Sequence, residues 1–183
     1  MPQTAIGLIE LNSIAAGMDV TDTMIKTANV ELVISRSICS GKYMVIISGD
    51  VAAVRSGVES GLKKWEGAII DHILLSNIDP QILPALAGNS QVTKPGALGI
   101  IEAFSVASLL EAADAAVKAA NVQLMEIRLA MALGGKAFVT LTGSVGNVRA
   151  AVDAGAERVS DKGLLVNKVV IPAPSPQLYK DFI

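Results

Sequence analysis

The chain has 183 residues, of which 51% are hydrophobic and 3% aromatic, and its formal net charge at pH 7 is −2. The balanced charge, without basic runs, disfavours a nucleic-acid-binding protein. The chain contains no stretch of about 18 consecutive apolar residues, so we expect no membrane span. The single cysteine excludes an internal disulfide and fits a reducing compartment. We also expect no secretory signal, because the first residues lack a charged segment and lead directly into a strand pattern.

The first half of the chain predicts two helices among four strands. The strands, rich in Val and Ile, are expected at residues 5–11, 31–38, 42–48 and 67–76. Ser13 can cap the first helix, which Asn29 ends, and Asp50 can cap the second. The predicted order is therefore β-α-β-β-α-β.

The second half repeats this order, with Ser105 and Ser144 as the helix caps. The proline-containing tail after Ile171 should leave the domain as an extended or short helical segment. We expect a first domain at residues 1–80, a linker with one helical turn at 81–96, and a second domain with a C-terminal tail at 97–183.

The two halves are copies of one unit. Residues 5–32 aligned with 97–124 give 12 identities in 28 positions, and residues 39–62 aligned with 133–156 give 9 identities in 24. A register held over this length indicates internal duplication. Each copy is then a small α/β domain of the α+β, ferredoxin-like type, and we expect copies to pack around a ring.

Motifs found in both copies resemble a known family. Gly-Leu-Ile-Glu at 7–10 and Gly-Ile-Ile-Glu at 99–102 each precede a helix that ends in Lys-x-Ala-Asn-Val. A Gly-Lys hairpin then precedes Gly-[Asp/Ser]-Val-x-x-Val-Arg, and Ile-Pro-Ala-Pro follows at 171–174. This pattern resembles the bacterial microcompartment (BMC) shell domain, in its ordinary and not its circularly permuted order.

One feature departs from the family pattern. The first copy ends in Asn77-Ile78-Asp79-Pro80 and, like the second copy at Ala173, lacks the basic residue that is common in this family's closing motif. Contacts between neighbouring tiles are therefore expected to differ from those of ordinary hexameric members.

The resemblance implies a structural shell protein, not an enzyme, located in a microcompartment shell in the cytoplasm. Tandem members form homotrimers, in which six domains make a pseudo-hexagonal tile with a central pore, and one such member carries an iron–sulfur cluster at that pore. The implied partners are other shell proteins and an encapsulated redox enzyme.

Cys39 is the leading candidate for cofactor binding. The resemblance places its link, Cys39-Ser40-Gly41, at the pore, whereas the matching link Leu133-Gly134-Gly135 offers no thiol. Three Cys39 thiolates around a three-fold axis would be the protein ligands of one [4Fe–4S] cluster per trimer, which would relay electrons or deliver iron–sulfur units. The alternative is that Cys39 is a residue of a tight turn without a cofactor.

The residues at the end of the first helix in each copy are candidates for the tile edge. Lys26 with Asn29 and Lys118 with Asn121 occupy the same positions in the two copies. The resemblance implies that the lysines pack across a two-fold contact between tiles. A cation that only favours the helix C-terminus is the alternative.

Other polar residues do not predict catalysis. Glu10 and Glu102 are repeated, but the only histidine, His72, lies in the last strand of the first copy, so we expect the carboxylates to form capping or inter-subunit hydrogen bonds. A lone histidine predicts no metal site, and nucleotide, serine-hydrolase and zinc-protease motifs are absent.

Three functions remain possible from the sequence. The first is a shell tile with a redox cluster in its pore, and the second is a shell pore that conducts metabolites without a cluster. The third is a ferredoxin-like trimeric regulator that binds a small effector, which the fold alone does not exclude. The repeated edge lysines favour a tile.

Overall fold

The computed structural model describes residues 4–92, 95–131 and 133–181. It contains two compact units, Met1–Ile78 and Asp79–Ile183. Residues 81–96, the expected linker, are therefore counted with the second unit. Residues 93–94 of that linker lie outside the described residues, as do residues 1–3 and 182–183 of the two expected domains.

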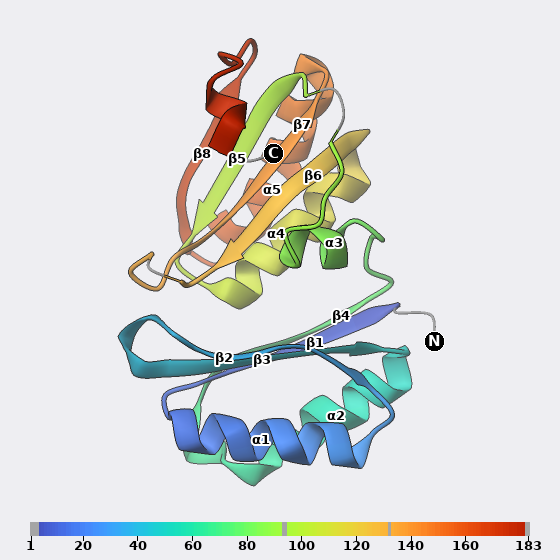
Figure 1. The fold of residues 1–183 in the computed structure, drawn as a ribbon, viewed down its shortest axis with the longest axis vertical. Helices are drawn as coiled ribbons and strands as arrows, with labels where there is room; N and C mark the ends of the chain where they lie inside the picture. The colour runs from blue at the N-terminus through green and yellow to red at the C-terminus, as the bar shows by residue number, and fades with distance from the viewer. Residues whose placement is uncertain (1–3, 93–94, 132, 182–183) are drawn as a thin grey trace. The chain divides into compact units, whose positions relative to one another are not determined.

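The first unit is a four-stranded antiparallel sheet with two long helices on one face (Figure 1). The strand order is β2-β3-β1-β4. In chain order the elements are β1 (Ala5–Leu11), α1 (Ile14–Thr27), β2 (Glu31–Ile38), the 3₁₀ turn η1 (Cys39–Gly41), β3 (Lys42–Gly49), α2 (Val51–Lys64), the 3₁₀ turn η2 (Glu66–Ala68) and β4 (Ile69–Ser76).

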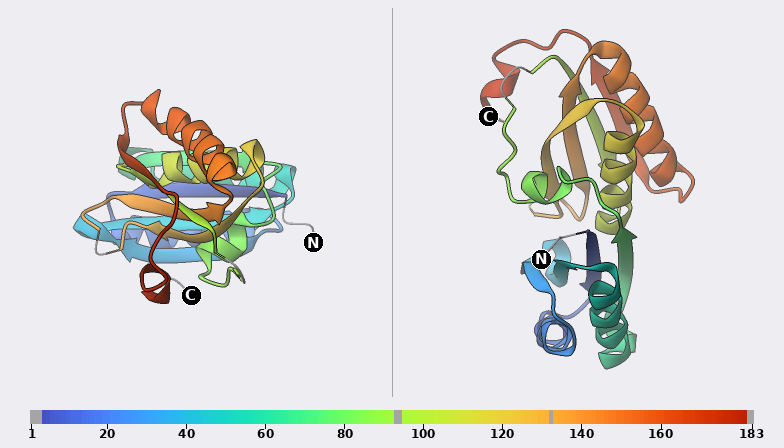
Figure 2. Two further views of the ribbon diagram at one scale, coloured as in Figure 1. Left: turned by 90° about the horizontal axis from the view of Figure 1, so that it is seen from above. Right: turned by 90° about the vertical axis from the view of Figure 1, so that its right-hand side faces the viewer.

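The second unit repeats this sheet in the order β6-β7-β5-β8 and adds a short helix before it. Its elements are α3 (Ile82–Leu86), β5 (Ala97–Ala103), α4 (Val106–Ala119), β6 (Val122–Leu129), β7 (Ala137–Gly143), α5 (Val145–Ser160), β8 (Leu165–Ile171) and the 3₁₀ turn η3 (Leu178–Asp181). Helices α4 and α5 cover one face of the sheet, and the tail lies on the other (Figure 2). The predicted fold class, two ferredoxin-like copies of the ordinary order, is confirmed.

The four expected helix caps are all present. Ser13, Asp50, Ser105 and Ser144 each accept a hydrogen bond from a backbone N–H three residues further on. Helix α1 ends at Thr27, two residues before Asn29. These local contacts explain why the helix starts could be read directly from the sequence.

The start of the last strand of the first unit was predicted two residues too early. Ala68 donates its N–H to the Trp65 carbonyl at 2.9 Å, which makes residues 66–68 a 3₁₀ turn, and the strand begins at Ile69. Ala68 continued the apolar pattern of the strand because its side chain belongs to the core of the first unit, although its backbone belongs to the turn.

The repeated glycine of the first strand allows a helix to lie close to the sheet. A Cβ atom on Gly7 would be 2.3 Å from Val58 Cγ2, and one on Gly99 would be 2.6 Å from Val152 Cγ2. Both distances are too short for real atoms, so only glycine lets α2 and α5 pack this closely on β1 and β5.

Candidate functional site

The Cys39 link is a tight hairpin turn between β2 and β3. Ser40 has φ 66° and Gly41 has φ 73°, and two successive positive φ values are what a type I′ turn requires. A Cβ on Gly41 would meet no atom within 4 Å, so the backbone conformation, not the lack of space, favours glycine there. The Cys39 side chain is half-buried at the start of this turn.

The matching link in the second unit keeps this geometry at its glycines. Gly134 has φ 61° and Gly135 has φ 85°. The turn is closed by Lys136, whose N–H donates to the Leu133 carbonyl at 3.1 Å. The two links therefore share two left-handed positions, and Ser40 occupies one of them without being glycine.

An ion pair joins the base of each link to the first strand of its unit. Lys42 Nζ lies 2.8 Å from Glu10 Oε1, and Lys136 Nζ lies 2.6 Å from Glu102 Oε1. The repeated carboxylates thus bind the lysine that follows each link within the same unit, and do not cap a helix. The inter-subunit hydrogen bond that was the other expectation stays a prediction. The sequence contained the signal, since both the Glu and the Gly-Lys pair recur in the two copies.

The candidate edge lysines form ion pairs along their own helices. Lys26 lies 2.6 Å from Asp22, and Lys118 lies 2.5 Å from Asp114, each four residues earlier. Both lysines are in the last turn of their helix, where a cation is favoured. Asn29 and Asn121 follow the two helices, and the Asn121 carbonyl accepts a hydrogen bond from Asn147 at 3.1 Å.

The same helix face is exposed in one unit and buried in the other. In α1, Met18 is 58% exposed, and Ile14 and Ile25 are also exposed. At the matching positions of α4, Leu110 is 0% exposed, and Val106 and Val117 are buried as well. The first unit therefore presents an apolar helix face that is covered in its copy.

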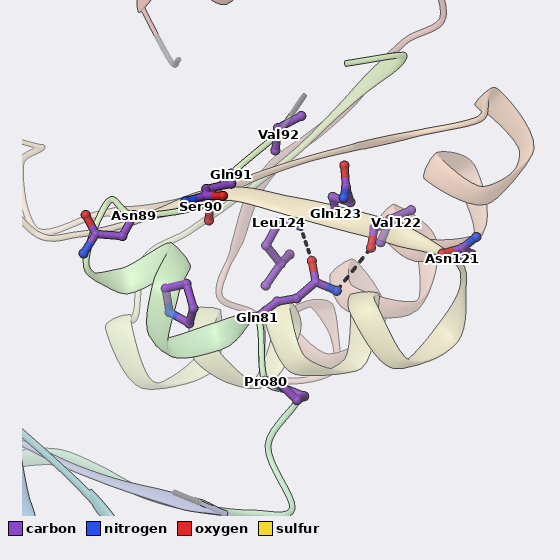
Figure 3. A pocket seen from close by; sticks show the side chains of 11 residues that line it. Pro80, Gln81, Asn89, Ser90, Gln91, Val92, Asn121, Val122, Gln123 and Leu124 are labelled. Carbon is purple, nitrogen blue, oxygen red and sulfur yellow. Dashed lines mark hydrogen bonds between the residues drawn. The ribbon is translucent and has the colours of Figure 1, made fainter. Parts of the chain in front are cut away.

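The second unit contains a hollow of about 490 Å³ beside the edge strand β6 (Figure 3). Its lining is rich in amide side chains and includes Gln81, Asn89, Gln91, Asn121 and Gln123. Gln81 Nε2 donates to the Val122 carbonyl at 3.3 Å, and Gln81 Oε1 accepts from the Leu124 N–H at 2.9 Å. The sequence analysis did not single out Gln81.

No group of three or more His, Cys, Asp or Glu side chains that could hold a metal occurs among the described residues of one chain. His72 is an exposed residue of β4. Within the described part of the chain, no helix is both long and apolar enough to span a membrane.

Known proteins share both units. The BMC domain family matches residues 5–78 and 97–174. The chain is 41% identical over 179 residues to the bacterial microcompartment shell protein PduT of Citrobacter freundii, which covers 98% of this chain and 97% of PduT. It is 32% identical over 187 residues to the carboxysome assembly protein CcmO of Synechococcus elongatus, covering 95% of this chain and 67% of CcmO.

A solved structure agrees with the fold and the tandem arrangement. A crystal structure of a microcompartment protein from Desulfitobacterium hafniense matches with a TM-score of 0.94 and 48% identity, over 97% of this chain and 99% of that one. By their names, PduT is a shell protein and CcmO is a carboxysome assembly protein. The chain belongs to the BMC-domain family, as a tandem, PduT-like shell protein of a bacterial microcompartment.

Proposed function

We propose that the protein is a homotrimeric shell tile, in which six BMC domains form a pseudo-hexagonal ring around a central pore. The observation that carries this proposal is the apolar face of α1, which is exposed although the matching face of α4 is buried. Exposed apolar patches of this kind mark interaction surfaces. A closed ring of identical chains would cover this face on every α1.

Sedimentation of the protein at micromolar concentration tests the trimer. Met18→Glu should dissociate it, because the change puts a charge on the proposed contact, whereas Met18→Leu should leave it intact. Both chains should stay folded, since Met18 is 58% exposed in the single chain. A wild type that sediments as a monomer would overturn the proposal.

The pore would carry a [4Fe–4S] cluster held by Cys39 from three chains. The donor chemistry fits, because such clusters are bound by cysteine thiolates and each chain has one cysteine. The thiol lies beside a tight turn in which Ser40 carries only a small side chain and Gly41 carries none. Three protein ligands would leave the fourth iron to another ligand, and the cluster would supply one-electron transfer between the lumen and the outside.

Iron and sulfide content per trimer, measured after anaerobic purification, tests the cluster. We expect about four irons in the wild type and none in Cys39→Ser, because a hydroxyl is a poor iron ligand. Ser40→Ala is the matched control, since it alters the same turn but keeps the thiol. Equal iron in wild type and Cys39→Ser, or none in either after reconstitution, would make Cys39 a turn residue and the pore a conduit for metabolites.

Membership of the shell family removes the support for the third function, a trimeric effector-binding regulator. The remaining partners are proposals as well: other shell proteins at the tile edges, and an encapsulated redox enzyme if the cluster is present.

A further inference from the structure

The turn that follows the last strand of the first unit is repeated at the end of the chain. Asp79-Pro80-Gln81-Ile82 follows β4, and Ser175-Pro176-Gln177-Leu178 follows β8. The two segments are separated along the chain by the same number of residues as the equivalent positions of β4 and β8. Gln81 N–H donates to Asp79 Oδ1 at 2.9 Å, and Gln177 N–H donates to Ser175 Oγ at 3.3 Å. The next N–H in each segment donates to the carbonyl of the first residue, at 3.0 and 2.9 Å, so the two segments fold into the same turn.

The segment that begins at Asp79 packs on α4 and β6 of its own unit through three polar contacts. The Asp79 N–H donates to Asp114 Oδ1 of α4 at 2.9 Å. The Gln81 amide pairs with the Val122 carbonyl and the Leu124 N–H on the free edge of β6, as another strand would (Figure 3). Ile82, the next residue, is 0% exposed. Such capping removes the unpaired backbone groups that make a sheet edge prone to association.

The matching surface of the first unit is uncovered. Its β2 is an edge strand with the same register on β3 that β6 has on β7. Leu32 is 46% exposed, whereas its counterpart Leu124 is 2% exposed. The Asp22 side chain is 52% exposed, whereas that of Asp114 is 11% exposed. These positions of α1 and β2 are the ones that the segment after β4 covers on α4 and β6.

The matching residues of the tail are also uncovered. Gln177 is exposed, and Leu178 is 40% exposed although its counterpart Ile82 is buried. The following residue, Tyr179, holds the tail on its own unit, where it packs with Leu98 and Met125 and donates from its hydroxyl to the Gly96 carbonyl at 2.7 Å. The tail is therefore anchored at one residue while the preceding two are presented to solvent.

We infer that the tail residues Ser175–Leu178 of one chain dock on α1 and β2 of a neighbouring chain, as residues 79–82 dock on α4 and β6. The Ser175 N–H would donate to Asp22, the Gln177 amide would pair with the Val30 carbonyl and the Leu32 N–H, and Leu178 would cover Leu32. The occupant is thus a second copy of this chain, and the contact closes the ring between chains. This inference rests on the proposed trimer, to which it adds a specific residue-level contact.

Chemical cross-linking between engineered cysteines tests this docking in a Cys39→Ser background. Glu31→Cys combined with Gln177→Cys, treated with a short bis-maleimide, should give covalent dimers and trimers on a denaturing gel, because position 31 is exposed beside the docking site. Gln81→Cys combined with Gln123→Cys, at the matching exposed position of β6, is the control, in which both thiols should react within one chain and leave a monomer band. Sedimentation before cross-linking reports the oligomeric state separately.

The outcomes distinguish the docking from the trimer. A trimer whose Glu31→Cys, Gln177→Cys chains give no intermolecular product, or react only within one chain, overturns the docking and leaves the trimer standing. A monomer overturns both. As a second measurement, Gln177→Ala should speed amide hydrogen exchange at Leu32 roughly tenfold within an intact trimer, as Gln81→Ala should at Leu124; an unchanged rate at Leu32 overturns the docking.

Discussion

Ser40 and Gly41 adopt the left-handed backbone conformation, which side chains with a Cβ disfavour. Ser40→Gly should therefore raise the free energy of unfolding by about 1 kcal/mol, and Gly41→Ala should lower it by about 1 kcal/mol. Denaturant unfolding of proteins in the same oligomeric state measures both changes. Gly67→Ala is the control, because its Cβ would also meet open space but its φ is not positive; an equal loss there would contradict the argument from φ.

The ion pairs at the base of the two links differ in burial. The Glu10 side chain is 6% exposed, whereas that of Glu102 is 29% exposed. Lys42→Met should lower the free energy of unfolding by about 1–3 kcal/mol, because it leaves a buried carboxylate without its charged partner. Lys136→Met, the matched change, should cost less, since water reaches Glu102. Equal losses in thermal or denaturant unfolding would show that burial does not set the cost.

At the scale of elements, the tail depends on one buried aromatic side chain. Removing the Tyr179 hydroxyl in Tyr179→Phe should lower the free energy of unfolding by about 1 kcal/mol near neutral pH, through loss of the hydrogen bond to Gly96. Burial raises the pKa of Tyr179 above its usual 10.0. The contribution of the neutral phenol is therefore present below pH 10 and is lost as the pH rises, because the unfolded chain ionises first.

Unfolding measured across this alkaline range checks the sign. The wild type should lose more stability than Tyr179→Phe as the pH passes 10. A parallel decline in the two proteins would assign the loss to other groups.

At the scale of the whole molecule, the edge lysines bear on how tiles join. Lys26→Ala and Lys118→Ala should each leave the trimer intact and weaken its assembly into sheets, through loss of charge and of the apolar stem. Electron microscopy of arrays and sedimentation of the trimer measure the two effects. Lys63→Ala removes the same charge from the exposed last turn of α2 and should not affect the arrays. If all three variants form sheets as the wild type does, the lysines are not at the edge.

The duplication, the order of the elements and the helix starts could all be predicted from the sequence by itself. These features depend on local signals: caps act over three residues, and the periods of strands and helices act over a few more. The repeated glycines and the Gly-Lys turn similarly identified the family, because each is required by a backbone conformation or a close contact within one unit.

Only the tertiary structure decided which of two equivalent residues is covered. Asp22 and Asp114 occupy the same position in the same kind of helix, and Leu32 and Leu124 the same position in the same edge strand, yet only the second of each pair is buried. The difference arises because Asp79 and Gln81, more than thirty residues away in the chain, pack against Asp114 and Leu124. The burial of a residue depends on such distant segments, and the local sequence pattern does not specify which segment will cover that residue.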